Sequence, residues 1–469
     1  MDTAKASPSP TPYSRPSWPW FVIVTLACLG IVVPAILAGG GGTSQARDFR
    51  GYHAIEIRRI QAQWPAPDLR DSCTSTTPGF HLVLGSLAAG GLSPMALRLC
   101  GGLSAVLAWL VIWRVAAVWT PPGRALIVSA PVALCSYLLG SAIWTTTDAL
   151  AIALAAATLA VGMLGRGDVR SSLMAGLLGC GAVTVRQILI WTSIPAGLRA
   201  ALSVSGPNRG RVPRLVFAVG LPAMCVIAFM LVWGGSVPPR FHDYHKAVWN
   251  PAAITLFLAC FGLFGAVLLP GIWLRLGRDA RRGCLIMAAA AAMVGAIPRS
   301  DYRKVLAPEE QAVSMGTAWM WEPPPAEAVR GAGEVGRWGG PLWEIAKRTP
   351  SVQGRSILLI VLSGFGGAVL IGLWTLADRS GRHIHALLLL AAVFGMALTQ
   401  CFNAQTFQRY FDPWILLTLG WMVAMALGTD RAKDAPLIAG MIVLAVVQAV
   451  GTVVGVILPA FSGPQLPAW

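Results

Sequence analysis

Charged side chains are scarce in this sequence. They account for 12% of its 469 residues, whereas a soluble domain carries about 25%. Hydrophobic residues reach 55%, and apolar runs of about 17–25 residues, long enough to cross a bilayer, recur along the chain. The shortage of charge therefore excludes an ordinary soluble protein. Because lipid offers the backbone no hydrogen bonds, we expect an all-α polytopic membrane protein with about a dozen transmembrane helices.

The motifs of several common kinds of site are missing as well. The sequence contains no CxxC and no HExxH pattern, and its glycine run at 39–42 follows a membrane span rather than a strand. A phosphate-binding loop needs a strand before it and a helix after it, so we interpret this run as a flexible exit from the span. Of the nine cysteines, Cys73 alone lies in a long polar loop and has no obvious partner there. A disulfide framework is therefore not expected.

Basic residues outnumber acidic ones and give a net charge of +16. They occur in short clusters between apolar spans, which is the pattern that the positive-inside rule produces in cytoplasmic loops. Nucleic acid is therefore not an expected partner, whereas membrane lipid is. The clusters that mark the cytoplasmic side lie at 166–170, 199–214, 275–282, 379–382 and 431–433.

The apolar segments divide the chain into four parts. Residues 1–18 are polar and rich in Ser and Pro, which predicts a disordered cytoplasmic N-terminus. Residues 19–298 form the main transmembrane module, which includes an external loop at 40–77 with interfacial helices. A second external loop follows at 299–353, and residues 354–469 supply the C-terminal transmembrane helices. The first span is too long for a signal-peptide core, so we expect it to be retained.

Two irregular stretches decide which residues lie outside. Residues 78–95 are interrupted by Gly85, Gly90, Gly91 and Pro94. We therefore expect either that they lie at the interface or re-enter rather than cross, or that a neighbouring segment counted as one crossing is not one. Residues 171–202 are predicted to form a broken hairpin with Arg186 at its outer tip. With this topology several ionisable residues, which are functional candidates by default at membrane depth, converge on the outer face. They are Asp48, His53, Asp148, Arg186, His242, His245 and Arg409.

Asp48 and His53 belong to the first external loop. Asp48 is either a solvated or arginine-paired loop carboxylate, or a general base within hydrogen-bond reach of a hydroxyl. Glu56 is a second candidate acid, but the stretch from Glu56 to Arg59 is typical of an amphipathic interfacial helix. His53 is either a structural residue, or it performs acid–base chemistry or donates a hydrogen bond to a phosphate oxygen.

Two arginines interrupt or flank apolar segments. Arg186, next to Gln187, either pairs with an acid such as Asp148 or binds a phosphate, whose oxygens match the guanidinium fork. Arg409 poses the same choice, and an ion pair with Asp412 is slightly favoured. Two more histidines, His242 and His245, flank Asp243 in an outer loop and could ligate a metal. No further ligand completes that shell, so hydrogen bonding to a sugar or phosphate, or an ordinary polar loop, is preferred.

At these residues the chain resembles the membrane glycosyltransferases of the GT-C superfamily. More narrowly, it is similar to the dolichyl-phosphoglucose-dependent alpha-1,2-glucosyltransferase family and its bacterial relatives, whose first luminal loop carries an acidic pair and a histidine. In that family Gln-Ala-Gln and Thr-Thr-Pro-Gly segments follow, and later a helix-embedded Arg-Gln pair and a His-rich loop. The corresponding stretches here are Asp48 to His53, Gln61 to Gln63, Thr76 to Gly79, Arg186-Gln187 and His242 to Pro251.

The resemblance departs from the family pattern at two points. Phe49 stands where the second acid of the pair is expected, and the spacing from Asp48 to His53 is one residue longer. Both departures bear on substrate and mechanism more than on the class of protein.

The resemblance implies a GT-C-like bundle and an enzyme of glycan biosynthesis in the cell envelope, placed in the inner membrane if bacterial. Such an enzyme moves a sugar from a polyprenyl-phosphate-linked donor to a glycan or lipid-linked acceptor outside the cytoplasm and inverts the anomeric carbon. Asp48 would be the base, and His53 would assist it. No cofactor is expected, although a divalent cation is compatible with the pattern. The remaining implied substrate-binding residues are Thr77, Asp148, Arg186, Gln187, His242, His245 and Arg409.

A membrane transporter or lipid flippase is the alternative. It would use the same intramembrane Arg and Asp residues, and helices broken by Gly and Pro are common in transporters. The sequence shows no repeat between its halves, and its conspicuous polar residues lie on one face rather than at the middle of the bilayer. Both observations favour the glycosyltransferase.

Overall fold

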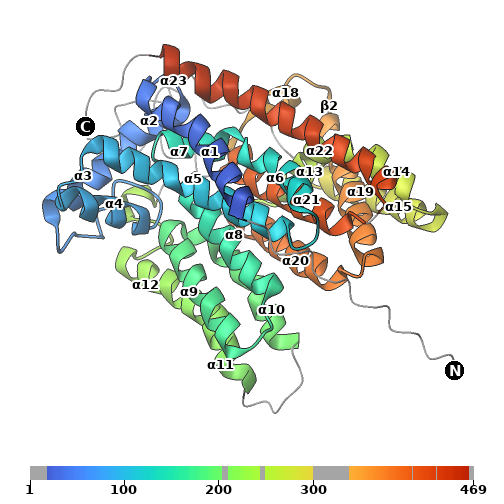
Figure 1. Ribbon diagram of the computed structural model, residues 1–469, viewed down its shortest axis with the longest axis horizontal. Helices are drawn as coiled ribbons and strands as arrows, with labels where there is room; N and C mark the ends of the chain where they lie inside the picture. The colour runs from blue at the N-terminus through green and yellow to red at the C-terminus, as the bar shows by residue number, and fades with distance from the viewer. Residues whose placement is uncertain are drawn as a thin grey trace.

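A computed structural model of the chain describes residues 18–202, 210–242, 249–298, 337–403, 405–428 and 430–463. These residues form a helical bundle in which the helices α9 to α12 extend to one side (Figure 1). The predicted disordered segment 1–18 lies outside the described residues except for its last residue. The predicted external loop 299–353 is described from residue 337 onwards.

The first third of the bundle begins with a long helix and then a set of short ones. Its elements are α1 (Trp18–Ala38), α2 (Ser44–Asp48), the π-helical turn η1 (Phe49–His53), α3 (Ala54–Gln63), α4 (Gly79–Ala89), α5 (Pro94–Ala116), α6 (Pro122–Ala133) and α7 (Ser136–Ile143).

The middle third is built on two apolar hairpins. Its elements are α8 (Asp148–Leu164), α9 (Val169–Val185), the 3₁₀ turn η2 (Gln187–Ser193), α10 (Ile194–Leu202), α11 (Arg211–Leu215), the π-helical turn η4 (Val216–Gly220), α12 (Leu221–Trp233) and the 3₁₀ turn η5 (Pro239–Phe241).

The described residues of the last third form several long helices and four very short strands, of which β1 pairs with β4 in parallel and β2 with β3 in antiparallel fashion. Its elements are α13 (Ala252–Gly265), η6 (Ala266–Leu268), α14 (Leu269–Arg275), α15 (Arg278–Ala296), β1 (Arg337–Gly339), α18 (Pro341–Ala346), β2 (Ser351–Val352), β3 (Arg355–Ser356), α19 (Ile357–Arg379), α20 (His383–Gln400), β4 (Gln405–Phe407), η8 (Gln408–Tyr410), α21 (Asp412–Ala426), α22 (Arg431–Thr452), η9 (Val453–Ile457) and α23 (Leu458–Ser462).

The prediction of an all-α polytopic membrane protein is confirmed. Within the described ranges, seven helices are long and apolar enough to cross a bilayer, and an eighth span results if α6 and α7, bent by 70° at a short break, count as one. Four shorter apolar helices, α4, α8, α9 and α21, accompany them. Every residue of α21 is buried, because this helix is apolar on all sides and lies at the centre of the bundle.

The basic clusters gather at one end of the bundle, as predicted. Arg275 forms an ion pair of 3.1 Å with Asp434, and Arg379 donates to the Arg275 carbonyl over 3.2 Å. Arg382 donates over 2.7 Å to the carbonyl of Met425, at the end of α21. The last carbonyls of a helix have no partner within it, so these guanidinium groups stabilise the end of the central helix while marking one side of the membrane.

The stretch at 78–95, predicted to be interfacial or re-entrant, contains a helix that is shorter than a membrane span. Its helix α4 has 11 residues and is therefore about 16 Å long, roughly half of the hydrocarbon core. Gly79 at its start packs against Thr184 at the end of α9. Shortly after its end, Arg98 donates over 3.3 Å to the carbonyl of Ile143 at the end of α7. The start of α4 thus lies beside the end of α9, and the first turns of α5 lie beside the end of α7.

The predicted hairpin at 171–202 is also confirmed. The helix α9 ends at Val185, Arg186 adopts an extended conformation with φ −148° and ψ 113°, and η2 with α10 runs back along the bundle. Ala196 then reaches Gly162 near the far end of α8, where a Cβ on the glycine would lie 2.8 Å from the Ala196 nitrogen. Arg186 therefore lies at the tip of the hairpin.

Two glycines allow α13 and α19 to cross at close range. A Cβ atom on Gly262 would overlap the carbonyl oxygen of Leu362, and a Cβ atom on Gly366 would overlap that of Leu258. Close backbone contact through small residues is a common means of packing helices in membranes.

We therefore expect Gly366→Ala to lower the free energy of unfolding by at least about 1–3 kcal/mol, because the added methyl group forces the two backbones apart. The measurement is the melting midpoint of the purified protein in nanodiscs. Gly283→Ala in α15, where a Cβ would meet no atom within 4 Å, is the matched control and should melt no lower than wild type. Equal midpoints for the two variants would contradict the tight crossing.

Candidate functional site

A π-helical turn brings the side chains of Asp48 and His53 into the same part of the structure. In an α-helix, residues five apart are about 140° away from each other around the axis. Here the π-helical turn η1 follows Asp48 and ends at His53. The Ala54 N–H donates to the carbonyl of Phe49 in the i→i+5 pattern. This pattern takes up one more residue per turn than an α-helix does. As a result Asp48 pairs with Arg409, and the charge of Arg409 also acts on His53.

Four charged side chains alternate in sign at the site. Arg409 forms an ion pair of 3.1 Å with Asp48, and Arg186 forms one of 2.8 Å with Asp148. The two pairs are neighbours, because Asp148 also acts on Arg409 and both arginines act on His53. The structure thus brings together five of the predicted residues.

Each of these side chains lies at the end of a helix. Asp48 is the last residue of α2, Asp148 the first of α8, and Arg186 follows the last residue of α9. Arg409 lies in η8 just before α21, with its guanidinium carbon 5.3 Å and 5.5 Å from the ring centres of Phe407 and Tyr410. The side chains of Asp48 and Arg409 are 38% and 44% exposed, so a ligand from outside the bundle can reach them.

The turn between α7 and α8 positions the Arg186 side chain through a hydrogen bond. Thr147 accepts a hydrogen bond of 3.1 Å from Arg186 Nε, and Asp148 follows it. Thr145 in the same turn has φ 55°, an unfavourable conformation for a β-branched residue. Buried Arg98 donates to the Ile143 carbonyl from α5, and Gly101, one turn later, leaves room for the Thr145 side chain. Local strain of this kind is maintained where packing enforces it, often at functional sites.

His53 has a buried histidine as its partner. Its Nδ1 lies 2.8 Å from Nε2 of His81, a residue of α4, and the two ring planes differ by 6°. Burial lowers the pKa of His53, and the nearby charges of His81, Arg186 and Arg409 lower it further. Burial also lowers the pKa of His81, to about 4. Both imidazoles are therefore neutral at physiological pH.

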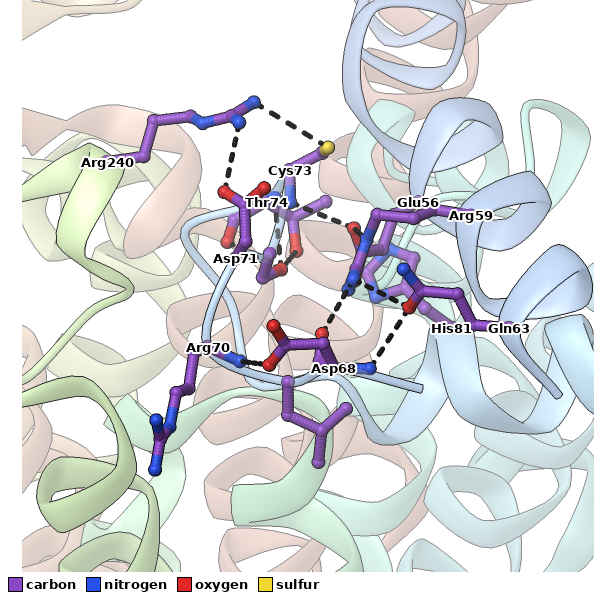
Figure 2. Close-up of polar contacts among 12 residues, drawn as sticks. Glu56, Arg59, Gln63, Asp68, Arg70, Asp71, Cys73, Thr74, His81 and Arg240 are labelled. Carbon is purple, nitrogen blue, oxygen red and sulfur yellow. Dashed lines mark hydrogen bonds and ion pairs between the residues drawn. The ribbon is translucent and has the colours of Figure 1, made fainter. Parts of the chain in front are cut away.

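The loop that joins α3 to α4 is held in place near His81 by the hydrogen bonds of Glu56 and Arg59 (Figure 2). Glu56 and Arg59 of α3 form an ion pair of 2.6 Å, the Cys73 N–H donates to Glu56 over 2.8 Å, and Arg59 donates over 2.6 Å to the carbonyl of Asp68. Burial raises the pKa of Glu56, but its hydrogen bonds from Arg59 and Cys73 outweigh burial and leave the pKa below its ordinary value. The preferred structural interpretation of Glu56 agrees with this pairing.

Thr77 and Gln187 connect the external loop to the tip of the hairpin. Thr77 Oγ1 donates over 2.6 Å to the Val183 carbonyl, and its backbone N–H donates over 3.2 Å to Gln187 Oε1. The Gln187 Nε2 group donates to the carbonyls of Ser75 and Ser236 over 2.9 and 3.1 Å. In the structure both predicted substrate-binding residues thus make hydrogen bonds to the protein itself, which holds Arg186 in place.

Two further predictions concern the later loops. The favoured ion pair between Arg409 and Asp412 is wrong, because Arg409 turns to Asp48 while Asp412 accepts a hydrogen bond of 3.0 Å from Gln408. His242 Nε2 lies 2.9 Å from the Val237 carbonyl, and His245 lies outside the described residues. In the described part of the chain, no group of three or more His, Cys, Asp or Glu side chains is arranged to hold a metal ion.

Sequence reasoning passed over His81 and Arg98. His81 lies two residues after the end of the Thr-Thr-Pro-Gly segment, but nothing in the sequence indicates that it meets His53 across 28 positions. Arg98 carried a usable signal, because an arginine inside an apolar span is rare and requires a specific environment.

The histidine pair should make stability depend on pH. The folded-state pKa of His81 is lowered from 6.5 to about 4, so below pH 6.5 the unfolded chain binds more protons than the folded one. The stabilisation is complete above pH 6.5 and is lost as the pH falls towards 4, by roughly 3 kcal/mol for His81 alone. We expect His81→Gln to reduce the fall in melting midpoint between pH 7 and 4.5, whereas exposed His383→Gln should retain it. Identical profiles for both variants would refute the assignment.

The comparisons with known proteins give only distant likenesses, among solved structures. No family model and no curated protein matches the chain. The archaeal oligosaccharyltransferase AglB from Archaeoglobus fulgidus, solved in complex with an inhibitory peptide and a dolichol-phosphate, resembles it with a TM-score of 0.45 and 14% sequence identity. The match covers 92% of this chain but 56% of the archaeal one, so this chain spans little more than half the length of that protein. The likeness concerns the general arrangement of helices alone.

Proposed function

We propose that this chain is an integral membrane glycosyltransferase. It moves a sugar from a polyprenyl-phosphate-linked donor to a lipid- or polymer-linked acceptor on the extracytoplasmic face, with inversion at the anomeric carbon. The observation that carries the proposal is the pair of arginines, Arg186 and Arg409, each bound to one carboxylate and both close to His53 at one end of the bundle.

The two arginines are suited to a phosphate. A guanidinium group offers parallel N–H donors that match phosphate oxygens, and it keeps its charge at any physiological pH. Two positive charges at helix ends stabilise the negative charge that collects on the phosphate when the sugar leaves. The polyprenyl chain remains in the lipid, while its phosphate meets the arginines at the membrane surface.

In this proposal Asp48 acts as the base. The acceptor hydroxyl oxygen forms a bond to the anomeric carbon, its proton passes to the Asp48 carboxylate, and the carbon–oxygen bond to the phosphate breaks. The bonding electrons stay on the polyprenyl phosphate, which Arg186 and Arg409 hold. A single displacement of this kind needs one base and inverts the carbon. Asp148 then serves to orient Arg186, to which it is bound over 2.8 Å.

The ion pair between Asp48 and Arg409 links donor binding to catalysis. While the carboxylate is bound to the guanidinium over 3.1 Å, its oxygen is engaged by Arg409 and not by an acceptor hydroxyl. A phosphate that arrives at Arg409 competes with Asp48 for the same N–H donors. Binding of the donor therefore frees the carboxylate for the acceptor hydroxyl.

Asp48→Asn should abolish most of the sugar transfer. We expect kcat to fall by about 10²- to 10⁴-fold, because the amide cannot accept the proton. The donor KM should stay level or decrease, because Arg409 loses its competing carboxylate. The measurement is transfer of radiolabelled sugar from polyprenyl-phosphate donors to acceptors in membranes that contain equal amounts of each variant.

Asp71→Asn is the matched control, since Asp71 is an exposed carboxylate of the same loop that pairs with Arg240 over 3.0 Å. It should transfer sugar like wild type. Wild-type rates in Asp48→Asn would move the base elsewhere. An absence of transfer from any donor by wild type, with lipid or solute flux in its place, would refute the proposal in favour of a transporter.

The sidedness is testable with single cysteines. Trp64 is exposed in the external loop, and Arg282 is exposed at the basic end of the bundle. In a Cys73→Ser background, we expect a membrane-impermeant maleimide to label Trp64→Cys in intact cells and Arg282→Cys after permeabilisation. Labelling in the reverse order would place the site on the cytoplasmic face.

A further inference from the structure

Among the described residues, His53 is the only hydrogen-bond partner of the His81 side chain. It is fully buried, and its Nε2 lies 2.8 Å from His53 Nδ1 with the two rings nearly coplanar. A hydrogen bond of this length requires one proton between the two nitrogens. Since both rings are neutral, each carries one proton, and the position of one proton decides the position of the other.

The second ring nitrogen of His81 settles which ring donates. In the described part of the chain, His81 Nδ1 is buried and has no hydrogen-bond partner. A buried N–H without an acceptor costs about 1–3 kcal/mol, and orphaned buried N–H groups are rarer than acceptors without donors. The proton of His81 therefore belongs on Nε2, where it is donated to His53. His53 Nδ1 must then be the acceptor, and His53 carries its own proton on Nε2.

We propose that His81 is a positioning residue that fixes His53 as an Nε2–H tautomer, so that His53 donates a hydrogen bond to a phosphate oxygen of the lipid-linked donor beside Arg186 and Arg409. The inference rests on the proposed function for the identity of the phosphate. It specifies the role of His53 at the same site: a neutral donor to the leaving group, and not a base.

The surroundings keep both rings uncharged. Arg186 and Arg409 face His53, and their charges oppose its protonation. Glu56 and Arg59 of α3 act on His81 with opposite signs and neutralise each other in their 2.6 Å ion pair. An uncharged donor next to two arginines adds a directed hydrogen bond to the phosphate without adding electrostatic repulsion among the groups that bind it.

Two substitutions separate the tautomer from simple packing. His81→Gln places an amide N–H2 at a reach similar to that of Nε2, and it should keep kcat within about threefold of wild type. His81→Leu fills the space without a donor and frees the His53 proton to occupy either nitrogen. We expect its kcat to fall by about 10- to 100-fold, as when a partner that orients a functional histidine is removed, with a melting midpoint at pH 7.5 equal to that of the Gln variant.

The tautomer itself is measured by ¹⁵N NMR of histidine-labelled wild type in nanodiscs, with His53→Gln used for assignment. The expected spectrum has a proton on His53 Nε2 and none on Nδ1, and His81→Leu should give a mixture. A proton on His53 Nδ1, or on both nitrogens, overturns the inference even if sugar transfer is observed. The expected tautomer in a wild-type protein that transfers no sugar overturns the proposed function instead. Equal loss of kcat in both His81 variants would also count against a positioning role.

Discussion

The exclusion of unpaired charge from a lipid-facing bundle is the constraint on which the site depends. A charged side chain at membrane depth is costly unless a partner or water compensates it, and Arg186 and Arg409 meet this condition by binding Asp148 and Asp48. The two ion pairs lie next to each other, so that charges alternate in sign. Such an arrangement is stable without a ligand and can exchange a carboxylate for another anion at little electrostatic cost, because the number of contacts to each guanidinium is conserved.

The rest of the outer end holds this arrangement in place. The hydrogen bonds of Gln187 fasten the tip of the hairpin to the external loop, and the strained turn at Thr145 directs Thr147 towards Arg186. At the opposite end, arginines such as Arg382 bind the last carbonyls of the central helix α21. Since Arg409 lies immediately before that helix, the basic end fixes the position of the site through a rigid element that runs between the two ends.

The class of fold and the position of Arg186 could be predicted from the sequence, whereas the pairing of the site residues could not, for physical reasons. The spacing of apolar runs gives the class of fold, and glycines with a proline show that the stretch 78–95 is too irregular to cross. An arginine between two apolar halves identifies the tip at Arg186. In each case the signal is local, because membrane insertion is governed by segments of contiguous sequence.

The pairings could not be predicted, because they join residues that are distant in the sequence. Arg409 had a nearby acid in Asp412, whereas its partner in the structure is Asp48, 361 positions away. Proximity along the chain was misleading here, since Asp412 begins a fully buried helix and its carboxyl group binds Gln408 instead. The partner of His53 is hidden from the sequence for the same reason.

The backbone accommodates the longer spacing between Asp48 and His53 locally. Compared with the family that the chain resembles, one more residue separates the acid from the histidine, and in a regular α-helix this would turn the histidine away by about 100°. The π-helical turn η1 takes up that residue, with an i→i+5 hydrogen bond from Ala54 to Phe49. Turns of this kind are uncommon and occur frequently at functional sites. With the extra residue taken up in this way, Asp48 pairs with Arg409 while His53 pairs with His81, and the charge of Arg409 acts on both.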